Sequence, residues 1–592
     1  MFDTYISVST TDRAAAIKQD AASEAEDAAA LIFYRTADGS HNNLKCPFAG
    51  MSGTRFGRNF PLNECYPDDI QALMQPNPRT VSRKLMAKKG TSHHADIINI
   101  LAVGWIQFQV HDWFNHGRDK DAEPYKLKAE DGDDWHEPNI KIPPTPADPT
   151  RTADDDRNLP PTYVNTESHW WDGSNIYGSD FEILKQLRTF KGGKLNYLED
   201  TGLPIDEETG LPKTGFTENW WLGLSLLHEI FTKEHNSICD MLASANPAWS
   251  DERLFQTARL INCALMAKIH TVEWTPAILP NSTVHMGMMT NWYGLVGERV
   301  AKIFGRVSDS EMISGIMGSS QSDHGVPYSL TEEFCSVYRL HSLIPDSISF
   351  YSHANGSDLG EHTFKDVSLS RTMQLLNNLS REDCLYSLGI GKPGAMVLHN
   401  YPDFLRKLEL PDGEILDLAA TDIFRDRERG IPRYNRFRTL LHKKKLSSID
   451  ELTSDPVLRE ELKEVYNDDI DAVDLQIGLL AEEPPPGFGF SETAFRIFVL
   501  MASRRLNADR FFTDDFTPEV YTCEGLDWIK NNTMKSLLVR HYPGLALALK
   551  GIDNAFKPWN NLSQAWIVDK QGERRLAASQ LMAERRSSLR FR

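Results

Sequence analysis

The sequence predicts a mainly α-helical fold organised as one large catalytic domain, and three observations support this prediction. Alternating strand patterns are few and short. No internal repeat and no clean linker divides the 592 residues, so one helical domain is the simplest architecture. Apolar residues recur at helical spacing in several long segments, which are 92–116, 218–245, 250–278, 291–304, 370–378, 396–409 and 492–507.

The composition divides the chain into three parts. Residues 1–30 are expected to form an N-terminal helical segment, because residues 12–31 are acidic and rich in alanine. Residues 31–570 are expected to form the catalytic domain. The tail at 571–592 includes "ERRLAASQLMAERRSSLRFR", a local positive charge on an otherwise acidic protein. Such a tail is either a solvated end or a weak attachment to an anionic membrane or an acidic partner.

The first part of the domain contains loops on both sides of one buried helix. Residues 38–80 are rich in Gly, Pro and Asn, which indicates an ordered loop region. The apolar stretch "IINILAVGWIQFQV" lies within the helix expected at 92–116. Residues 117–165 are polar, charged and rich in proline, so we expect a long surface excursion there.

Composition and charge exclude several classes of protein. Hydrophobic residues make up 41% of the chain and charged residues 25%, as in soluble globular proteins. The net charge of −19 argues against nucleic-acid binding over the body of the protein. The N-terminus has neither a long apolar run nor a basic-then-apolar leader, so we expect a cytoplasmic protein. Seven scattered cysteines without a CxxC motif indicate reduced thiols rather than disulfides, zinc or an iron–sulfur cluster.

The stretch "FQVHDWFNHG" at 108–117 places chemically active side chains close together. His111 and Asp112 are neighbours, so on a helix their side chains point about 100° apart. Gln107 and His111 are four residues apart and share one helix face. This arrangement predicts two adjoining sites, one on each face, whose remaining members come from elsewhere in the chain.

The stretch "SVYRLHSLIPDSI" supplies a second histidine beside a redox-capable phenol. Tyr338 and His341 are three residues apart and share a face if this segment is helical. Taken alone, such a pair is typical of a packed, hydrogen-bonded surface. Together with His111 it allows another arrangement, in which one histidine is the axial ligand of a haem iron and the other is an acid–base group on the opposite face.

Five blocks, in order, carry a family resemblance: "IQFQVHDWFNHG", "SHWWDGSNIYG", "VYRLHSLIPD", "DRERGIPRYNRFR" and "MASRRLNADRFF". The chain resembles the haem-dependent fatty-acid α-dioxygenases of the peroxidase–cyclooxygenase superfamily, also called animal-type haem peroxidases. The resemblance covers most of the chain, from about residue 30 to about residue 530. It implies a single-domain, mainly α animal-haem-peroxidase-like fold around one buried haem b.

The resemblance assigns the residues around the haem. It makes His111 the distal histidine and His341 the proximal ligand of the haem iron. Gln107 is the remaining polar partner of His111, because the equivalent of the peroxidase arginine stretch, "GFTENWWLGLSLLHEIFTKEHN", contains no arginine. Asn400 in "VLHNYP" matches the family's acceptor for the proximal histidine, which fixes that ring's tautomer. The alternative for Asn400 is an amide on a helix surface.

The resemblance also implies a calcium site that includes Asp112. "SHWWDGS" offers the Ser168 hydroxyl, the Trp170 carbonyl, the Asp172 carboxylate and the Ser174 hydroxyl. With the Asp112 carboxylate these form an oxygen-only set that suits Ca²⁺. The family usually has threonine in place of Ser168, a change that keeps the hydroxyl. The alternative reading is a turn-forming loop without a metal.

A carboxylate clamp is the third implied site. His270 and Thr275 in "KIHTVEWTPAIL" and Arg505 in "SRRLNADRFF" match positions near the fatty-acid head group in the family. An arginine binds a carboxylate through two parallel hydrogen bonds, and a hydroxyl and an imidazole add orienting ones. Arg504 and Arg510 compete with Arg505 for this role, and Arg505 could instead pair with a haem propionate or a surface acid.

These residues predict a haem-dependent fatty-acid α-dioxygenase. The resemblance implies that a hydroperoxide activates the haem while His111 moves the proton, and that Tyr338 becomes a tyrosyl radical. The radical takes hydrogen from C2 of a long-chain fatty acid and O₂ adds there. The 2-hydroperoxy product can lose CO₂ to give an aldehyde one carbon shorter. The alternatives are a haem peroxidase, a dioxygenase that acts at another carbon, and a non-catalytic haem- or lipid-binding protein.

Other histidine-containing segments are weaker candidates for a metal or catalytic site. "HHAD" at 93–96 resembles the His-x-Asp of facial-triad iron enzymes, but those ligands usually lie on barrel strands. "HEIFTKEH" at 228–235 has the wrong spacing for a zinc helix. His116 is five residues from His111, on another helix face, and we interpret it as a helix-end histidine without chemistry.

Overall fold

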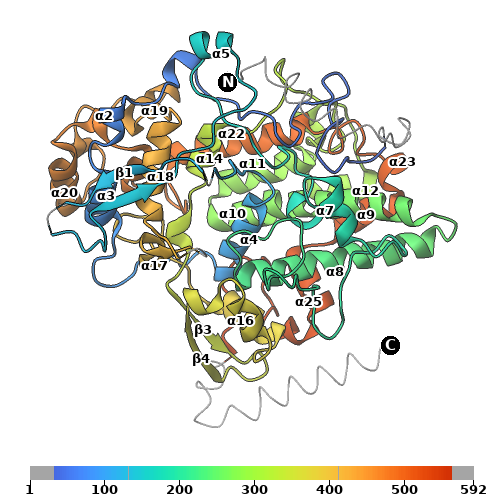
Figure 1. Cartoon of the computed structure of the whole chain (residues 1–592). Helices are drawn as coiled ribbons and strands as arrows, with labels where there is room; N and C mark the ends of the chain where they lie inside the picture. The colour runs from blue at the N-terminus through green and yellow to red at the C-terminus, as the bar shows by residue number, and fades with distance from the viewer. Residues whose placement is uncertain (1–32, 120, 131, 411–412, 563–592) are drawn as a thin grey trace.

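The computed structural model describes the chain from residue 33 to residue 562, apart from three short gaps, as residues 33–119, 121–130, 132–410 and 413–562. The predicted N-terminal helix at 1–30 and the basic tail at 571–592 lie outside these residues. The described part is a body of helices with few strands, which confirms the predicted fold class (Figure 1).

The described strands form three small antiparallel sheets of two strands each. They pair β1 (Tyr125–Lys128) with β2 (Asn139–Ile142), β3 (Ser347–Tyr351) with β4 (Asp358–Thr363), and β5 (Leu408–Glu409) with β6 (Ile415–Leu416).

Three long helices form the centre of the molecule. They are α4 (Ile100–Val110), α8 (Leu222–Ala245) and α9 (Asp251–Ile269), and α8 packs against both of the others (Figure 1). Asn99 caps α4 and Ser250 caps α9, because each side chain accepts a hydrogen bond from a backbone N–H in the first turn. After α9 the chain makes a π-helical turn, His270–Trp274, and continues as α10 (Thr275–Ile278). Such widened turns are frequent at functional sites.

Two further helices approach this centre from the second half of the chain. α14 (Glu332–Val337) packs against α22 (Glu492–Ala508). Thr331 caps α14 through the Phe334 N–H, and the helix ends at Tyr338. A short 3₁₀ turn, His341–Leu343, follows at once. The predicted pair of Tyr338 and His341 is therefore split between the end of one helix and the start of a turn.

Shorter helices surround these elements. They are α2 (Ile70–Leu73), α3 (Pro78–Val81), α5 (Ala153–Asn158), α6 (Ser174–Tyr177), α7 (Phe181–Leu187), α11 (Ser282–Tyr293), α12 (Gly297–Phe304), α13 (Glu311–Ser314), α15 (Arg371–Leu376), α16 (Arg381–Ile390), α17 (Asp403–Arg406), α18 (Leu418–Glu428), α19 (Tyr434–Leu440), α20 (Pro456–Tyr466), α21 (Leu475–Ala481), α23 (Pro518–Tyr521), α24 (Cys523–Asn531) and α25 (Met534–His541).

Several predicted boundaries are wrong, each for a local reason. The helix predicted at 396–409 is reduced to the four residues of α17, because His399 has a positive φ and Pro402 precedes the helix. The segment 291–304 is interrupted at Gly294, whose φ is 71°, and the chain there passes so close to Ile313 that a Cβ would lie 2.0 Å from its carbonyl oxygen.

The segment 117–165 is also less exposed than predicted. It contains the β1–β2 hairpin, whose residues Ile140 and Ile142 are fully buried in a small cluster with Phe424 of α18. No disulfide joins any two of the seven cysteines, all of which lie in the described part of the chain, in agreement with the predicted reduced thiols. Among the described residues, no helix has the length and apolarity needed to cross a membrane.

Candidate active site

His111 lies at the C-terminal end of α4, inside the protein. Its side chain is buried, its ring packs on Phe216 with centroids 4.8 Å apart, and its Nδ1 has no hydrogen-bond partner. Burial lowers the pKa of His111 to about 3, so the ring is neutral at physiological pH. A neutral imidazole is able to accept a proton, as the predicted distal role requires.

Gln107 is one turn before His111, but its amide is already hydrogen-bonded. Its Oε1 accepts from the Trp221 indole at 2.7 Å and its Nε2 donates to the Asn219 carbonyl at 3.3 Å. Gln107 therefore ties α4 to the start of α8. Its predicted part beside His111 stays a prediction.

His341 is oriented by two groups that the sequence did not single out. Its Nδ1 lies 3.0 Å from Asp422 Oδ2 and 3.1 Å from the Tyr401 hydroxyl. Burial alone would raise the pKa of Asp422, but His341 and Arg339 bring it below its ordinary value. An anionic partner places the proton on Nδ1 and leaves the Nε2 lone pair free as a ligand.

The expectation that Asn400 holds the proximal histidine is corrected by this geometry. The Asn400 amide hydrogen-bonds the backbone of His93 and Ala395 instead. Those backbone groups would otherwise be unpaired, and they use both ends of the amide. Tyr401 is the next residue and Asp422 lies just before the block "DRERGIPRYNRFR", yet only the folded chain brings them to His341.

The two histidines fit a haem. His111 has a buried nitrogen without a partner and His341 a free Nε2, while the ring of His341 is fixed by a carboxylate. The side chain of His341 is 29% exposed, so its free edge is not enclosed by protein atoms. A protein-derived imidazole with one nitrogen anchored is the usual axial ligand of haem iron.

A second group of unpaired polar atoms surrounds Trp113. The Tyr338 hydroxyl, His270 Nε2, Arg505 Nη1 and Trp113 Nε1 are all buried without a hydrogen-bond partner. The Trp113 ring lies 5.2 Å from the His270 ring and 4.9 Å from the Tyr338 ring, and the Arg505 guanidinium stands over it at 5.2 Å. We call these four residues the carboxylate pocket.

His270 presents a donor to this pocket. The Trp105 indole donates to His270 Nδ1 at 3.2 Å, so the neutral ring carries its hydrogen on Nε2. Burial, followed by the Arg505 charge, lowers the pKa of His270 to about 3, which keeps the ring neutral. Thr275 is differently placed, because its hydroxyl donates to the His270 carbonyl at 2.9 Å. It must turn that hydroxyl to reach a ligand.

Arg505 is the member of the arginine cluster that faces Tyr338. Its Nε donates to the His169 carbonyl at 3.0 Å and its Nη2 to the Trp170 carbonyl, which leaves Nη1 unpaired. Arg504 donates to the Asp323 carbonyl, and Arg510 pairs with Asp515. Burial raises the pKa of Tyr338 well above its ordinary value although Arg505 opposes this, so the phenol keeps its hydrogen.

The residues of the predicted calcium site converge on the other side of α4. Ser174 Oγ donates to Asp112 Oδ1 and Ser168 Oγ to Asp172 Oδ2, both at 2.8 Å. Asp112 Oδ2 and Asp172 Oδ1 are buried without hydrogen-bond partners, and Arg505 Nη2 lies 3.9 Å from Asp112 Oδ2. Burial and then the Asp172 charge raise the pKa of Asp112 well above its ordinary value. Two unpaired buried carboxylate oxygens side by side fit a cation, while the Trp170 carbonyl in this set accepts from Arg505.

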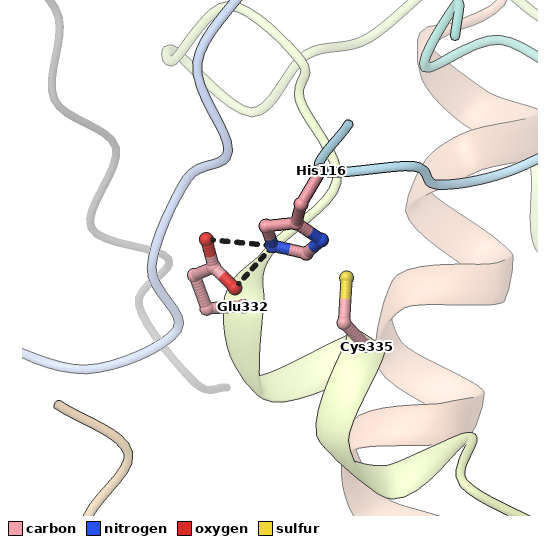
Figure 2. A group of neighbouring side chains, drawn as sticks. All are labelled: His116, Glu332 and Cys335. Carbon is pink, nitrogen blue, oxygen red and sulfur yellow. Dashed lines mark hydrogen bonds and ion pairs between the residues drawn. The ribbon is translucent and has the colours of Figure 1, made fainter. Parts of the chain in front are cut away.

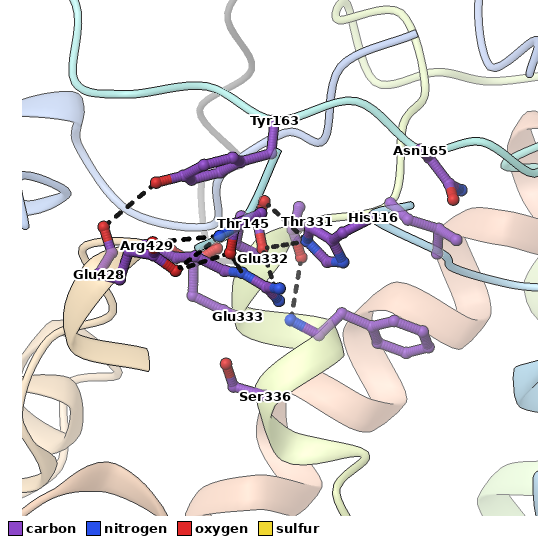
Figure 3. A network of polar contacts seen from close by, with 12 residues as sticks. His116, Thr145, Tyr163, Asn165, Thr331, Glu332, Glu333, Ser336, Glu428 and Arg429 are labelled. Carbon is purple, nitrogen blue, oxygen red and sulfur yellow. Dashed lines mark hydrogen bonds and ion pairs between the residues drawn. The ribbon is translucent and has the colours of Figure 1, made fainter. Parts of the chain in front are cut away.

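A third buried group contains His116, and here no side-chain nitrogen or oxygen is buried without a hydrogen-bond partner. His116 Nε2 donates to both oxygens of Glu332, at 3.0 and 3.2 Å, with Cys335 beside them (Figure 2). Arg429 lies 4.0 Å from the same carboxylate and donates to Thr145 (Figure 3). His116 follows the end of α4 and Glu332 begins α14, so the pair ties these helices together.

This group, which we call the His116–Glu332 network, also contains Thr145, Tyr163, Glu428 and Arg429. Thr145 donates to Glu428 at 2.7 Å, and the Tyr163 hydroxyl donates to the Glu428 carbonyl at 3.3 Å (Figure 3). The ligand-type atoms of His116, Glu332 and Cys335 lie within 4.8 Å of one another. Hydrogen bonds to Glu332 already use His116 Nε2, which is consistent with the interpretation of His116 as a structural residue.

The remaining histidine motifs do not assemble metal sites within the described part of the chain. Asp96 of "HHAD" pairs with Lys392. In "HEIFTKEH", Glu229 pairs with Arg381, and His235 hydrogen-bonds Tyr177 and a backbone carbonyl.

Known proteins resemble this chain over most of its length. A family model described as animal haem peroxidase matches residues 34–551. Alpha-dioxygenase 2 of Arabidopsis thaliana is 40% identical over 544 residues, which are 89% of this chain and 84% of that protein. Alpha-dioxygenase PIOX of Oryza sativa subsp. japonica is 39% identical over 89% of this chain and 86% of its own length.

Solved structures agree with these sequences. A Tyr-to-Phe variant of Oryza sativa fatty acid alpha-dioxygenase with palmitic acid has a TM-score of 0.84 at 37% identity, covering 90% of this chain and 89% of that one. The Arabidopsis thaliana fatty acid alpha-dioxygenase has a TM-score of 0.85 at 36% identity, covering 94% and 86% of the two chains. The chain therefore belongs to the animal haem peroxidase family and, within it, to the fatty-acid alpha-dioxygenases.

Proposed function

We propose that this protein oxygenates a long-chain fatty acid at C2, giving a 2-hydroperoxy acid that can lose CO₂ to form an aldehyde one carbon shorter. The observation that carries the proposal is the carboxylate pocket, in which three unpaired donors and an unpaired phenol are buried around one indole. A buried polar group without a partner costs about 1–3 kcal/mol, so four such groups together indicate a missing ligand.

A fatty-acid carboxylate satisfies these donors. Arg505 Nη1 and His270 Nε2 are both N–H groups, and one of them carries a positive charge, which roughly doubles the strength of its hydrogen bond to an anion. A head group held there lies beside Tyr338, whose ring contacts the same indole. We propose that this places the carbon next to the carboxyl group within reach of the Tyr338 phenol.

The tyrosine is the group that would act on the substrate. A haem b held by His341, when bound, supplies the one-electron oxidation that turns the Tyr338 phenol into a phenoxyl radical. Its oxygen then takes the C2 hydrogen atom and becomes a phenol again. O₂ adds to the C2 radical, and the resulting peroxyl group takes the hydrogen atom back from Tyr338. His111, neutral at physiological pH, is able to accept the proton of the activating hydroperoxide.

We also propose a structural Ca²⁺ at Asp112, Ser168, Trp170, Asp172 and Ser174. The oxygens of Asp112 and Asp172 without hydrogen-bond partners support it, and the pKa of Asp112 is raised by burial and then by the Asp172 charge, both of which a cation would offset. Because Asp112 follows His111, such an ion would fix the end of α4.

The function is tested with the haem-loaded protein and palmitic acid. We expect O₂ uptake and CO₂ release that depend on the fatty acid, and neither under argon. Rapid oxidation of guaiacol by hydrogen peroxide without O₂ uptake on palmitic acid would contradict the proposal and favour a peroxidase. Palmitic acid binding without turnover would favour a lipid-binding protein.

A further inference from the structure

Large apolar side chains gather on the surface of one segment, residues 286–313. Among the described residues, seven large apolar side chains are more than 60% exposed, and five of these lie in this segment. The five are Met286, Leu295, Ile303, Phe304 and Met312, with exposed fractions of 65–73%. Single exposed apolar residues are normal on a protein surface, whereas a contiguous group of them marks an interaction site.

The helix α12 turns its apolar face outward. None of its eight residues is buried, and Ala301 is the apolar residue through which it packs against the main core. Val300, Ile303 and Phe304 are three and four residues apart, so their side chains share one face of the helix. Glu298 and Lys302 form an ion pair of 2.7 Å on the opposite face. The helix is therefore amphipathic, but its apolar side is the one left exposed.

The loops on the two sides of α12 carry the rest of this surface and lie side by side. The Leu295 N–H donates to the Met312 carbonyl at 2.9 Å, and the Val296 N–H donates to the Ile313 carbonyl at 3.2 Å. The helix α11 packs against both α12 and α13, so the whole segment forms one unit (Figure 1). We call its exposed apolar residues the apolar patch, which consists of Leu295, Ile303, Phe304, Met312 and Ile313.

This unit is attached to the elements that carry the carboxylate pocket. The helix α11 follows the π-helical turn of His270 and the short helix α10. Asn291 in α11 donates to the hydroxyl of Ser503 in α22 at 2.8 Å, two residues before Arg505. Asn507 of α22 donates to Glu311 of α13 at 3.3 Å. The apolar patch and the carboxylate pocket therefore share α22 as a support.

The surface of a lipid bilayer fits the chemistry of this patch. An amphipathic helix that lies in the plane of a membrane buries its apolar face at the boundary between headgroups and acyl chains. The segment 286–313 carries three cations and three anions, which are Arg299, Lys302, Arg306, Glu298, Asp309 and Glu311. This balance complements headgroups that bear both charges, such as phosphatidylcholine. The patch contains one aromatic ring and is otherwise aliphatic, whereas the cores of protein–protein interfaces are rich in aromatic residues.

We propose that the apolar patch docks this protein onto a zwitterionic bilayer, from which the enzyme takes its fatty acid. The uptake of the fatty acid rests on the proposed function, because a long-chain fatty acid dissolves in the bilayer, whereas the docking itself does not depend on any reaction. An attachment through the basic tail at 571–592 would instead require anionic lipid. The two modes of attachment are therefore separated by the charge of the lipid.

Docking is tested by sedimentation of the haem-loaded, full-length protein with phosphatidylcholine vesicles. We expect binding that changes less than about twofold between low and high salt, because insertion of apolar side chains is not screened. Replacing part of the lipid with anionic phosphatidylglycerol should not strengthen it more than about twofold. Absence of binding to phosphatidylcholine, or binding only when anionic lipid is present, would overturn the proposal.

Matched variants locate the docking surface. Ile303→Asp and Phe304→Asp should each weaken vesicle binding at least about tenfold, since each removes a large apolar side chain from the contact. Ile70→Asp and Val457→Asp change residues that are both 63% exposed but lie outside the segment, and should leave vesicle binding unchanged. In Phe304→Trp, brominated phosphatidylcholine should quench more of the tryptophan fluorescence than in the wild type. Unchanged binding in both patch variants would overturn the proposal.

Two further measurements separate docking from its alternatives. Analytical ultracentrifugation without lipid should show the same mass for the wild type and Ile303→Asp, and a wild-type dimer that this substitution dissociates would assign the patch to a second copy instead. Phe304→Asp should slow O₂ uptake when vesicles supply palmitic acid but not when a cyclodextrin complex supplies it, and equal slowing would contradict uptake from the bilayer. If the wild type takes up no O₂ from either source, the proposed function fails, while vesicle sedimentation still decides whether the patch docks.

Discussion

Two buried polar regions lie at the ends of the same pair of helices, α4 and α14, and they differ in how far their polar atoms are paired. In the carboxylate pocket, Tyr338, His270 and Arg505 each leave an atom without a partner. In the His116–Glu332 network, the ring nitrogen and the carboxylate bond each other and neighbouring groups (Figure 3). Both regions contain histidine, acid–base groups and an aromatic ring, so composition alone does not separate them.

The difference is informative because evolution rarely leaves buried polar groups unpaired. A fully paired network stabilises the fold, whereas an unpaired cluster is stable only if a ligand completes it. The network therefore acts as a brace that holds the end of α4 against the start of α14. The carboxylate pocket contains polar atoms without hydrogen-bond partners, and a bound substrate would supply those partners. Substitutions of the same kind should act on activity in one region and on stability in the other.

The largest expected contrast is between two Tyr-to-Phe substitutions. Tyr338→Phe removes the atom that takes the C2 hydrogen, so O₂ uptake on palmitic acid should fall at least about a thousandfold, equivalent to about 4 kcal/mol. Tyr163→Phe in the network removes a hydroxyl bonded to the Glu428 carbonyl and should change the rate less than about twofold. The absorption spectrum of the bound haem, measured in parallel, should be the same in both variants. Retained oxygenation in Tyr338→Phe would exclude its radical role.

For the free energy of unfolding we expect the opposite result, with a larger loss from a substitution in the His116–Glu332 network than from one in the carboxylate pocket. Glu332→Gln removes the charge that lies 4.0 Å from the buried Arg429 guanidinium and weakens the acceptor for neutral His116, and removing one partner of a buried charge pair costs about 3–5 kcal/mol. Tyr338→Phe loses no hydrogen bond, so its free energy of unfolding should stay within about 1 kcal/mol of the wild type. Denaturant unfolding of the haem-loaded proteins measures both. A larger loss in Tyr338→Phe than in Glu332→Gln would reverse the roles assigned to the two regions.

Asp112 and Asp172 resemble the carboxylate pocket, because each has a buried side-chain oxygen without a hydrogen-bond partner. If they hold Ca²⁺, an ion at 100 times its dissociation constant adds about 2.7 kcal/mol to stability. Removing calcium with EGTA should then lower the melting temperature, and readdition of Ca²⁺ but not Mg²⁺ should restore it. Asp172→Asn should abolish this dependence. If neither EGTA nor Ca²⁺ changes the melting temperature, the proposed Ca²⁺ site is excluded and the loop is a turn without a metal.

The candidate site residues are easier to predict from the sequence than the ends of the helices around them. His111, Tyr338, His270 and Arg505 were identified because each sits in a recognisable block, and the fold brings the last three around Trp113. Trp113 could not be recognised in the sequence as part of this group, since an indole in an apolar segment gives no sign that its N–H will be unpaired.

Partners from distant segments could not be predicted. Asp422 and Tyr401 orient His341, and Trp105 fixes the tautomer of His270. These contacts join residues 60 to 165 positions apart, and the longest is Trp105 to His270. Asn400 was predicted from its residue type and from its position in "VLHNYP". In the structure its amide donates to the backbone carbonyls of His93 and Ala395. Sequence pattern specifies which side chains can do the chemistry, and tertiary packing decides which hydrogen bonds they make.

The smallest expected effect is a pH dependence of stability that comes from the network. Burial, followed by Arg429, lowers the pKa of His116 from 6.5 to about 4. Between these values the unfolded chain binds a proton at His116 and the folded chain does not, so the free energy of unfolding falls as the pH decreases from 6.5 to 4. One group contributes at most about 1.4 kcal/mol per pH unit. His116→Gln keeps a donor for Glu332 but does not titrate, and should reduce the slope by up to this amount. An identical slope in the wild type and His116→Gln would mean that His116 already accepts the proton in the folded state, and the pair with Glu332 would then be ionic on both sides.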